Sequence, residues 1–449
     1  MLSQGNYHRV PVKALLVALL LFSAGRNLPA GGIDRDGTGA KSMSLGGADV
    51  GWTNDPLTSL ADNPAGLGFM NGGMLNLGDT TVYPSGHFSN RVDPNGYMTD
   101  RILTAPEGAL GTQINHSPVR VALGFFPEAG LDGDWRYIDP PGGAGGTTSY
   151  GFQQQRSEII ELRTAVGMGI QFTSELSLGA SVGLVYNENK LQAPYIFQNE
   201  PALPPGFKTL LNLQTSGWSA DGNVGLQYHP ADDVLLGVVY KTETRVRTTG
   251  DAYGNANAQL AAAGLGGVPS AFHYDAEVDN VFPQSVSGGG SWIASPKWTL
   301  SGQIDWIDWS QFDMLPVKLT NGSNTDINGV VGSSSLSDSI PLKWTDQLVY
   351  RTGVEYHLTD DFALRAGYIY GKSPVPTSTL TPLTAAITEN TITAGIGYTH
   401  GRFSVDAGYQ YSLPTTRTVG LSGLQAGEYD DTSVRVSIQT FTVTATVRF

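Results

Sequence analysis

The chain has 449 residues, with 26 basic and 40 acidic side chains and a formal net charge of −14. This balance excludes nucleic acid as the default partner, since phosphate binding needs clustered Lys and Arg. The absence of Cys excludes disulfides and thiolate metal sites. The length admits two or three soluble domains or one large barrel, and a charged fraction of only 15% is low for soluble domains.

The N-terminus carries the one long apolar run of the sequence. Basic residues precede residues 14–24 (ALLVALLLFSA), and small residues follow them. A basic flank with a short apolar core predicts a secretory signal peptide over residues 1–30, cleaved near Ala30, because the core is too short to span a bilayer. A retained interfacial helix is the alternative.

Residues 31–72 are dense in Gly, Asp and Asn and show no alternation of apolar and polar side chains. Such a stretch buries too little apolar surface to form a domain of its own. Small and polar residues can, however, fold against the polar interior of a barrel, so we expect a plug (hatch) here and a barrel over residues 73–449. The turn chemistry of the plug, and the gate that we expect it to form, lie at Asn63, Pro64, Ala65 and Gly66.

From there on, apolar residues recur at every second position, which predicts β-strands. The pattern is clearest at 160–172, 176–186, 218–228, 348–356, 362–370, 392–398 and 403–411. A soluble sandwich also alternates, but these runs exceed its usual strand length of about five or six residues. Their apolar faces also end in Tyr or Trp, as at an aromatic membrane girdle. The sequence therefore predicts strands with lipid outside and a polar interior.

The connections between strands alternate in length. Short turns are predicted at 116–118, 173–175, 230–233, 295–297, 359–361 and 400–402. Long connections are predicted at 84–107, 127–157, 190–214, 249–277, 316–340, 372–389 and 413–432, with helical periodicity only around 255–265. This alternation is typical of outer-membrane barrels with periplasmic turns and extracellular loops. It predicts an all-β, antiparallel transmembrane barrel of 14 strands, within two.

The sequence ends on the amphipathic strand FTVTATVRF. In a closed barrel the last strand pairs with the first, so no sheet edge stays open. The final Phe449 resembles the signal that the outer-membrane assembly machinery reads, and an ordinary strand of a soluble β-protein is the alternative. The apolar phase shifts between Ile438 and Phe441, which predicts a bulge near Gln439 and Thr440.

Several stretches resemble the outer-membrane transporters of long-chain fatty acids and hydrocarbons (FadL-type, OMPP1/FadL/TodX). The resemblance is carried by "SLADNPAGLGFM", "VFPQSVSGGGSW", "WTLSGQIDWIDWSQFD", "LKWTDQLVYRTGVEYHLTDDFALRAGYIYGKSPVP" and "ITAGIGYTHGRFSVDAGYQYS", which occur in this order. It covers the plug and the C-terminal 170 residues or so, whereas 127–277 matches only as a pattern of strands and loops.

The resemblance implies passive uptake of hydrophobic molecules, which are caught among the extracellular loops, bound near the hatch and released sideways at a kinked third strand. In this sequence that strand is predicted at 120–126, where Gly124 and Pro127 can interrupt pairing; a plain bulge or strand end is the alternative. Gly31 and Gly32 stand where the family commonly has an aromatic residue. We expect a hydrophobic ligand to contact Phe69, Met70, Phe125 and Phe126.

Three inward-facing arginines could bind the carboxylate of an amphiphile. They are Arg163, Arg351 and Arg365, of which the last two are expected on neighbouring strands. Ion pairs with inward Asp and Glu are the alternative, and a neutral hydrocarbon needs no cation. The segments 193–211 and 257–272 are the best candidates for a loop groove. Trp306 and Trp309 are expected in the lipid belt rather than on a stacking platform.

Little in the sequence supports catalysis. It contains neither HExxH nor GxSxG, and we expect no enzyme activity, metal or cofactor. We therefore expect a monomer in the outer membrane, in contact with the lipid bilayer and lipopolysaccharide, that takes up fatty acids or hydrocarbons. A porin or gated channel for polar solutes is the main alternative, and an outer-membrane lipase or esterase is a weaker one.

Overall fold

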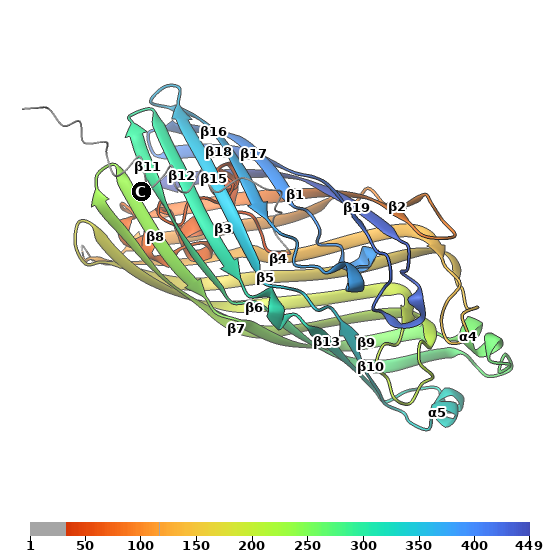
Figure 1. Cartoon of the computed structure of the whole chain (residues 1–449). Helices are drawn as coiled ribbons and strands as arrows, with labels where there is room; N and C mark the ends of the chain where they lie inside the picture. The colour runs from red at the N-terminus through yellow and green to blue at the C-terminus, as the bar shows by residue number, and fades with distance from the viewer. Residues whose placement is uncertain (1–32, 116) are drawn as a thin grey trace, which may run out of the picture.

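The computed structural model describes residues 33–115 and 117–449, so the expected signal peptide and its cleavage site near Ala30 lie outside the described residues. The described strands form one antiparallel sheet. The sheet closes on itself because β1 (Met74–Ser89) pairs with β19 (Ser433–Arg448) along its whole length. Figure 1 shows the resulting elongated barrel.

The strands follow one another around the ring in chain order. After β1 come β2 (Gly96–Met98), β3 (Leu103–Gln113), β4 (Val119–Asp139), β5 (Gly151–Gln171), β6 (Leu176–Ile196), β7 (Lys208–Ala231), β8 (Val234–Lys241), β9 (Thr244–Asn255), β10 (Ala271–Phe282), β11 (Ser285–Ser295), β12 (Trp298–Ile307), β13 (Met314–Thr320), β14 (Leu336–Pro341), β15 (Gln347–His357), β16 (Phe362–Gly371), β17 (Asn390–His400) and β18 (Phe403–Thr418).

These segments make up 14 barrel strands in the described part of the chain, as predicted. Four barrel strands are each interrupted once, namely β8/β9, β10/β11, β12/β13 and β14/β15, and β2 is a short addition between β1 and β3. Each of the six predicted short turns falls at the junction of two consecutive strands; β5 ends at Gln171, for example, and β6 begins at Leu176. The expected closed antiparallel barrel is thus confirmed.

Most of the long connections are shorter than predicted because the strands continue beyond the lipid belt, whereas the connection between β16 and β17 spans 372–389, as predicted. The connection expected at 190–214, for example, spans only 197–207. The expected helical stretch contains α4 (Asn257–Ala262), and α5 (Thr325–Val331) lies in another long connection. Within residues 33–115 and 117–449, no helix is long and apolar enough to cross a membrane.

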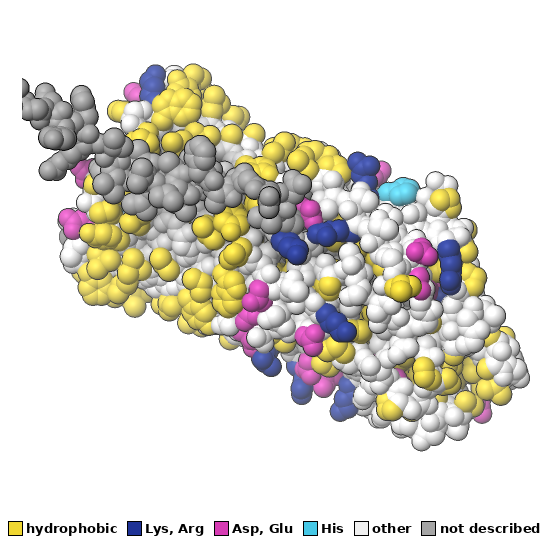
Figure 2. Space-filling model, in the orientation of Figure 1, with side chains coloured by type: hydrophobic (Ala, Val, Ile, Leu, Met, Phe, Trp, Pro, Cys, Tyr) yellow, Lys and Arg dark blue, Asp and Glu magenta, His cyan; other side chains and the backbone are white. Residues whose placement is uncertain are grey.

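The outer surface of the barrel divides into two zones. Toward the short turns it is covered by apolar side chains, including Leu162, Val166, Val182, Leu184 and Val224, each more than 40% exposed. In Figure 2 this zone is largely yellow, whereas the other half of the molecule is mostly white with scattered charges. An apolar surface of this extent marks contact with lipid.

The last strand corrects the bulge predicted near Gln439 and Thr440. β19 pairs with β1 without any register shift, and the bulge in this region lies on β18, between Ser412 and Thr415. Even-numbered residues of β19 face inward above and below the predicted bulge. The apolar residues move from even to odd positions because the interior of the barrel, which the even positions face, changes from apolar to polar along the strand. The geometry of the strand itself stays the same.

The same inversion occurs on β7. Near its extracellular end Leu211 and Leu213 are buried inside while Asn212 is exposed outside. Near the short turn Gln227 is buried inside and Val224 is exposed outside. The barrel is therefore polar inside at the level of the lipid belt and apolar inside above it.

Residues 33–72 precede the first strand and lie within the ring (Figure 1). They form α2 (Gly39–Ser44), α3 (Pro56–Ala61) and the 3-10 helix η1 (Pro64–Phe69). Asp55 starts α3 by accepting hydrogen bonds from the backbone N–H groups of Leu57 and Thr58. α2 packs on β16 to β19, whereas α3 and η1 pack on strands between β1 and β7. The segment thus touches the wall on opposite sides.

Candidate functional site

The four residues expected at the gate form a tight, buried turn. Asn63 is fully buried, and its Nδ2 donates to the backbone oxygens of Val50 (2.7 Å) and of Leu226 on β7 (3.2 Å). Its Oδ1 accepts from the N–H of Ala65 (3.1 Å). One side chain therefore fastens the start of η1 both to its own segment and to the barrel wall.

The remaining gate residues pack closely on their surroundings. Pro64 begins η1, and Gly66 lies so close to Thr53 that a Cβ on this glycine would be 2.2 Å from Thr53 Oγ1. Phe69 stacks on His229 of β7 with ring centroids 3.9 Å apart. Met70 is fully buried against β3, where a Cβ on Gly111 would touch its thioether. Phe69 and Met70 therefore anchor the segment to the wall.

The arginines considered for carboxylate binding are paired with wall and plug carboxylates. Arg351 binds Asp305 (2.5 Å) and Asp36 (2.9 Å), so it joins β15 to β12 and to the N-terminal segment. Arg365 lies on the neighbouring β16, as expected, and binds Glu355 (2.5 Å) and Asp406 (2.6 Å).

Arg163 on β5 is fully buried and equally occupied. Its Nε lies 2.8 Å from an Asp221 carboxylate oxygen, and its Nη1 donates to the backbone oxygen of Leu60 in α3 (2.9 Å). All three arginines therefore connect the wall to itself or to the N-terminal segment.

The third barrel strand, β4, is interrupted in its middle. Among the described residues, its ladder with β3 ends at Gly108 paired with Phe125, and its ladder with β5 shifts register between Pro127 and Ala129. Gly124, just before this point, faces inward with no room for a Cβ beside Leu60.

The two phenylalanines of this strand point to opposite sides. Phe125 is 45% exposed on the outer surface, whereas Phe126 is buried, with its ring 5.8 Å from the guanidinium of Arg163. Only Phe126 therefore lies on the inner side of the wall.

The start of the N-terminal segment forms backbone hydrogen bonds with β4 beyond the point where the ladder between β3 and β4 ends. Asp34 and Ala129 form an antiparallel bridge. On either side, Arg35 N–H donates to Glu128 O (3.2 Å), and Gly130 N–H donates to Ile33 O (3.0 Å). Residues 33–35 thus act as a short added strand on the inner side of the interruption.

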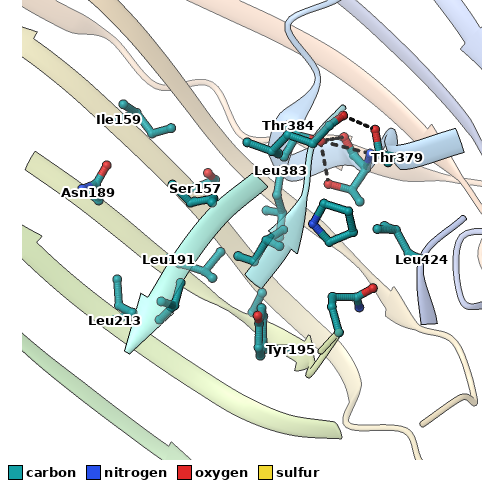
Figure 3. A pocket seen from close by; sticks show the side chains of 18 of the residues that line it. Ser157, Ile159, Asn189, Leu191, Tyr195, Leu213, Thr379, Leu383, Thr384 and Leu424 are labelled. Carbon is teal, nitrogen blue, oxygen red and sulfur yellow. Dashed lines mark hydrogen bonds between the residues drawn. The ribbon is translucent and has the colours of Figure 1, made fainter. Parts of the chain in front are cut away.

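An apolar cavity lies above this point, in the extracellular half of the barrel. Its volume is about 150 Å³. Figure 3 shows Ile159, Leu191 and Leu213 of the wall strands on one side of it and Leu383 and Leu424 of the extracellular connections on the other. Extracellular connections thus line one side of the cavity, and Ile33 of the N-terminal segment lines it as well.

None of the residues expected to bind substrate lines this cavity. Of the two candidate loop segments, 193–211 contributes five lining residues, Ala193, Pro194, Tyr195, Ile196 and Gln198, whereas 257–272 contributes none. The sequence does contain a signal for the cavity. On the extracellular side of the aromatic girdle, apolar residues such as Leu191 and Leu213 occupy the strand positions that face inward.

The position of Trp309 also differs from the lipid belt expected for it. Trp309 begins the 3-10 helix η2 (Trp309–Gln311) and is fully buried, and its ring lies 5.0 Å from that of Trp344. Its Nε1 donates to Gln347 Oε1 (3.1 Å). The chain leaves the wall between β12 and β13, which turns this indole inward, while Trp306 remains on the wall strand β12.

Comparison with known proteins identifies this barrel. Residues 28–449 match the family model described as outer membrane protein transport protein (OMPP1/FadL/TodX). The chain belongs to this family. It is accordingly an outer-membrane protein, as the sequence predicted.

Individual relatives of this OMPP1/FadL/TodX protein are distant. Alkane uptake protein A of Marinobacter nauticus is 25% identical over 260 residues, which cover 55% of this chain and 52% of the relative. The chain thus spans about half the length of this relative. The toluene transporter TodX of Pseudomonas putida has the same fold, with a TM-score of 0.72, 21% identity and coverage of 94% of this chain and 100% of that one.

A second toluene transporter, TbuX of Ralstonia pickettii, is similar to the same degree. Its TM-score is 0.71 at 21% identity, with coverage of 92% of this chain and 99% of that one. A FadL homologue of Pseudomonas aeruginosa gives 0.72 at 17% identity, with coverage of 93% and 100%. At these identities the likeness establishes the fold alone.

A polar chamber of about 100 Å³ lies between the N-terminal segment and the wall of this family member. Six carboxylates line it, Asp34, Asp62, Glu128, Glu161, Asp221 and Asp305, against three cations, Arg35, Lys241 and Arg351. An apolar molecule gains nothing from entering such a space, because the charged groups would lose solvent.

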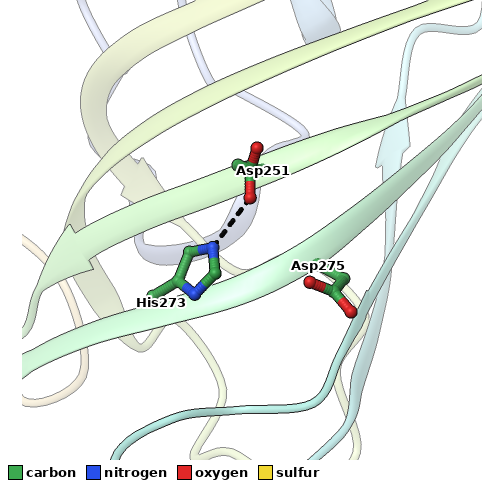
Figure 4. A group of neighbouring side chains, drawn as sticks. All are labelled: Asp251, His273 and Asp275. Carbon is green, nitrogen blue, oxygen red and sulfur yellow. Dashed lines mark hydrogen bonds and ion pairs between the residues drawn. The ribbon is translucent and has the colours of Figure 1, made fainter.

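A further cluster lies on β9 and β10, where Asp251, His273 and Asp275 bring one ligating atom each to within 4.8 Å of the others (Figure 4). His273 Nε2 lies 2.8 Å from Asp251, and Asn321 Nδ2 donates to Asp275 (2.6 Å). Their spacing in the sequence gave no sign of this group, because it forms across two strands. Asp251 and Asp275 are exposed and His273 is partly buried, and all three already have protein partners, so the group carries no assigned chemistry.

Proposed function

We propose that this protein carries out passive uptake of hydrophobic small molecules across the outer membrane. The observation that carries the proposal is the apolar cavity in the extracellular half of the barrel, which reaches the interrupted β4. A molecule entering between the extracellular loops exchanges water for apolar walls, which favours its capture by about 25 cal/mol per Å² of apolar surface buried. No energy source is needed for movement down a gradient.

The exit that we propose is lateral. Ile33 and Leu131 line the apolar cavity and lie beside the β4 interruption, which supports release at this point into the membrane. The polar chamber, with its excess of carboxylates, disfavours a path straight through the lumen. In this proposal residues 31–72 are the plug, Asn63 to Gly66 hold it in place, and Gly124 and Pro127 belong to the opening strand.

The substrate class that we favour is neutral hydrocarbons, with fatty acids second. Relatives are described as transporters of alkanes or toluene, and each arginine considered for a carboxylate is already paired. A porin for polar solutes would need an open polar lumen, and here the extracellular half is apolar. We further propose a monomer without enzyme activity that contacts lipopolysaccharide and is assembled through Phe449.

Uptake into liposomes tests the proposal. Protein-containing liposomes should accumulate labelled toluene and decane faster than protein-free liposomes, and labelled glucose should enter at the background rate. Leu191→Trp, which fills the cavity, should lower hydrocarbon uptake severalfold, whereas Val166→Trp on the lipid-facing surface should not. Glucose entry as fast as that of toluene would instead support the porin.

A further inference from the structure

A buried ionic cluster joins three extracellular segments above the apolar cavity. Lys208, the first residue of β7, is fully buried, and its Nζ lies 2.6 Å from Asp139 at the end of β4. It also lies 2.7 Å from Glu428, in the connection between β18 and β19, and donates to the backbone oxygen of Pro140 (3.1 Å). The three donors of the ammonium are thereby all used.

The members of this cluster differ in their relation to the cavity. Glu428 lines it, together with its neighbours Gln425 and Tyr429, whereas Lys208 and Asp139 do not. Glu428 is therefore the member of the cluster that both binds the ammonium of Lys208 and borders the space that a ligand would occupy. It holds the position that the carboxylate of an amphiphilic ligand would need in order to reach this cation.

The other cation at the cavity, Lys190, is also paired with carboxylates. Lys190 lines the cavity and its Nζ lies 2.9 Å from Glu158 and 2.6 Å from Glu188. An anionic headgroup entering the cavity would thus meet two carboxyl groups, Glu158 and Glu428, and no cation without a partner. Burying an unpaired carboxylate in such a place is costly.

We infer that Glu428 is a specificity-determining residue, which covers Lys208 and so excludes carboxylates while admitting uncharged molecules of the same length. The inference rests on the proposed function, because it concerns the ligand of the same cavity. It predicts that a shorter residue at this position uncovers the ammonium and converts the cavity into one that binds fatty acids.

The test compares two ligands that differ only in their headgroup, decanoate and 1-decanol. Their binding is followed by the intrinsic tryptophan fluorescence, to which Trp344 in the cavity lining contributes, in purified full-length protein at about pH 8.5, where decanoate is ionised. Glu428→Ala should raise the affinity for decanoate about tenfold or more, the effect of one hydrogen bond to a charged group. Affinity for 1-decanol should stay within about twofold of the wild type.

Asp139→Asn is the matched control, since it removes the same charge from Lys208 on the side away from the cavity. Decanoate binding should not rise in this variant, because Glu428 still covers the ammonium. An equal rise in both variants would show an effect of overall charge and overturn the inference, as would no rise in Glu428→Ala. Glu428→Gln, which keeps the shape of the side chain, should raise decanoate binding less and serves if the alanine variant does not fold.

The outcome for the wild type separates this inference from the proposed function. A wild-type protein that binds both ligands equally contradicts the role of Glu428 alone. A wild-type protein that binds neither ligand contradicts hydrophobic uptake itself.

Discussion

Asp34 and Ala129 pair as an antiparallel bridge at the point where β4 has lost its partner β3. This bridge attaches the N-terminal segment to β4, with one backbone hydrogen bond on each side of it, from the N–H groups of Arg35 and Gly130. Arg35 also binds Glu107 of β3 (2.5 Å), so the same short segment holds both strands. A lateral exit at this place requires that residues 33–35 move.

Locking this bridge should therefore stop uptake. Residues paired across antiparallel strands have Cα atoms at distances that a disulfide can span, and the chain has no Cys of its own. Asp34→Cys combined with Ala129→Cys should form a disulfide that abolishes toluene uptake into liposomes, and a reductant should restore it. Uptake that continues through the oxidised protein would contradict the proposed exit.

A disulfide elsewhere in the wall provides the control. Ser291 on β11 and Ser301 on β12 are paired in register, and their hydroxyl oxygens are 2.7 Å apart. Replacing both by Cys should also give a disulfide, because the two residues are paired across antiparallel strands and their side chains are in contact, but uptake should be unchanged in the oxidised and the reduced protein.

Asn63→Ala should loosen the N-terminal segment without disrupting the barrel. The substitution removes the side-chain hydrogen bonds to the backbone oxygens of Val50 and Leu226, and it takes the acceptor from the buried N–H of Ala65; a buried unsatisfied group costs about 1–3 kcal/mol. Hydrogen exchange of residues 50–66 should therefore become faster while exchange in β15 and β16 stays the same. Asn95→Ala, in an exposed loop, should change neither.

Much of the barrel could be predicted from the sequence because its physical cause is local. Turn residues such as Thr359 and Gly401 mark strand ends, and alternation on strands such as 362–370 marks the lipid-facing side. The family resemblance rested on short motifs in the same order. These signals predict the number of strands, the closure of the barrel and its location in the outer membrane. The structure and the family match agree with these predictions.

Features that depend on a change of environment along one strand could not be predicted in this way. A prediction from alternation assumes that apolar residues face outward. The inversion between Ile438 and Phe441 then predicts a bulge, and the strand ends near 190–214 are predicted to be loops, although the structure has neither. The cavity follows from that inversion. The partners of Arg351 and Lys208 come from distant segments, such as Asp36 and Glu428, and only the fold brings them together.

Arg365→Met should destabilise the barrel rather than remove a ligand contact. The substitution leaves Glu355 and Asp406 as buried carboxylates without their shared cation, and breaking such a buried pair costs about 3–5 kcal/mol. The temperature of unfolding, followed by the mobility of unheated and heated samples on gels, should fall.

Neutralising the two acids tests this explanation. The triple variant Arg365→Met, Glu355→Gln and Asp406→Asn should recover most of the lost stability, because no unpaired charge remains. If Arg365 instead bound ligand, Arg365→Met would reduce decanoate binding at unchanged stability, and the triple variant would not restore it.

The closure of the last extracellular connection should depend on pH through Glu428. Burial raises the pKa of its carboxyl group to about 8 from the ordinary 4.5; the neighbouring Lys208 acts in the opposite direction, and Asp139 raises it further. Tyr429, partly buried beside it, carries no charge in this range because burial raises the pKa of its hydroxyl group.

Between about pH 4.5 and pH 8 the closed form therefore keeps a proton on Glu428 that the opened form releases. Opening becomes easier as the pH rises through this window, and levels off above it. Hydrogen exchange of residues 419–432, corrected for the intrinsic effect of pH, should show more frequent opening at about pH 8.5 than at about pH 5.5. In Glu428→Gln this difference should largely disappear, because the amide does not titrate. A wild-type connection that opens less often at the higher pH would contradict the assignment of the proton to Glu428.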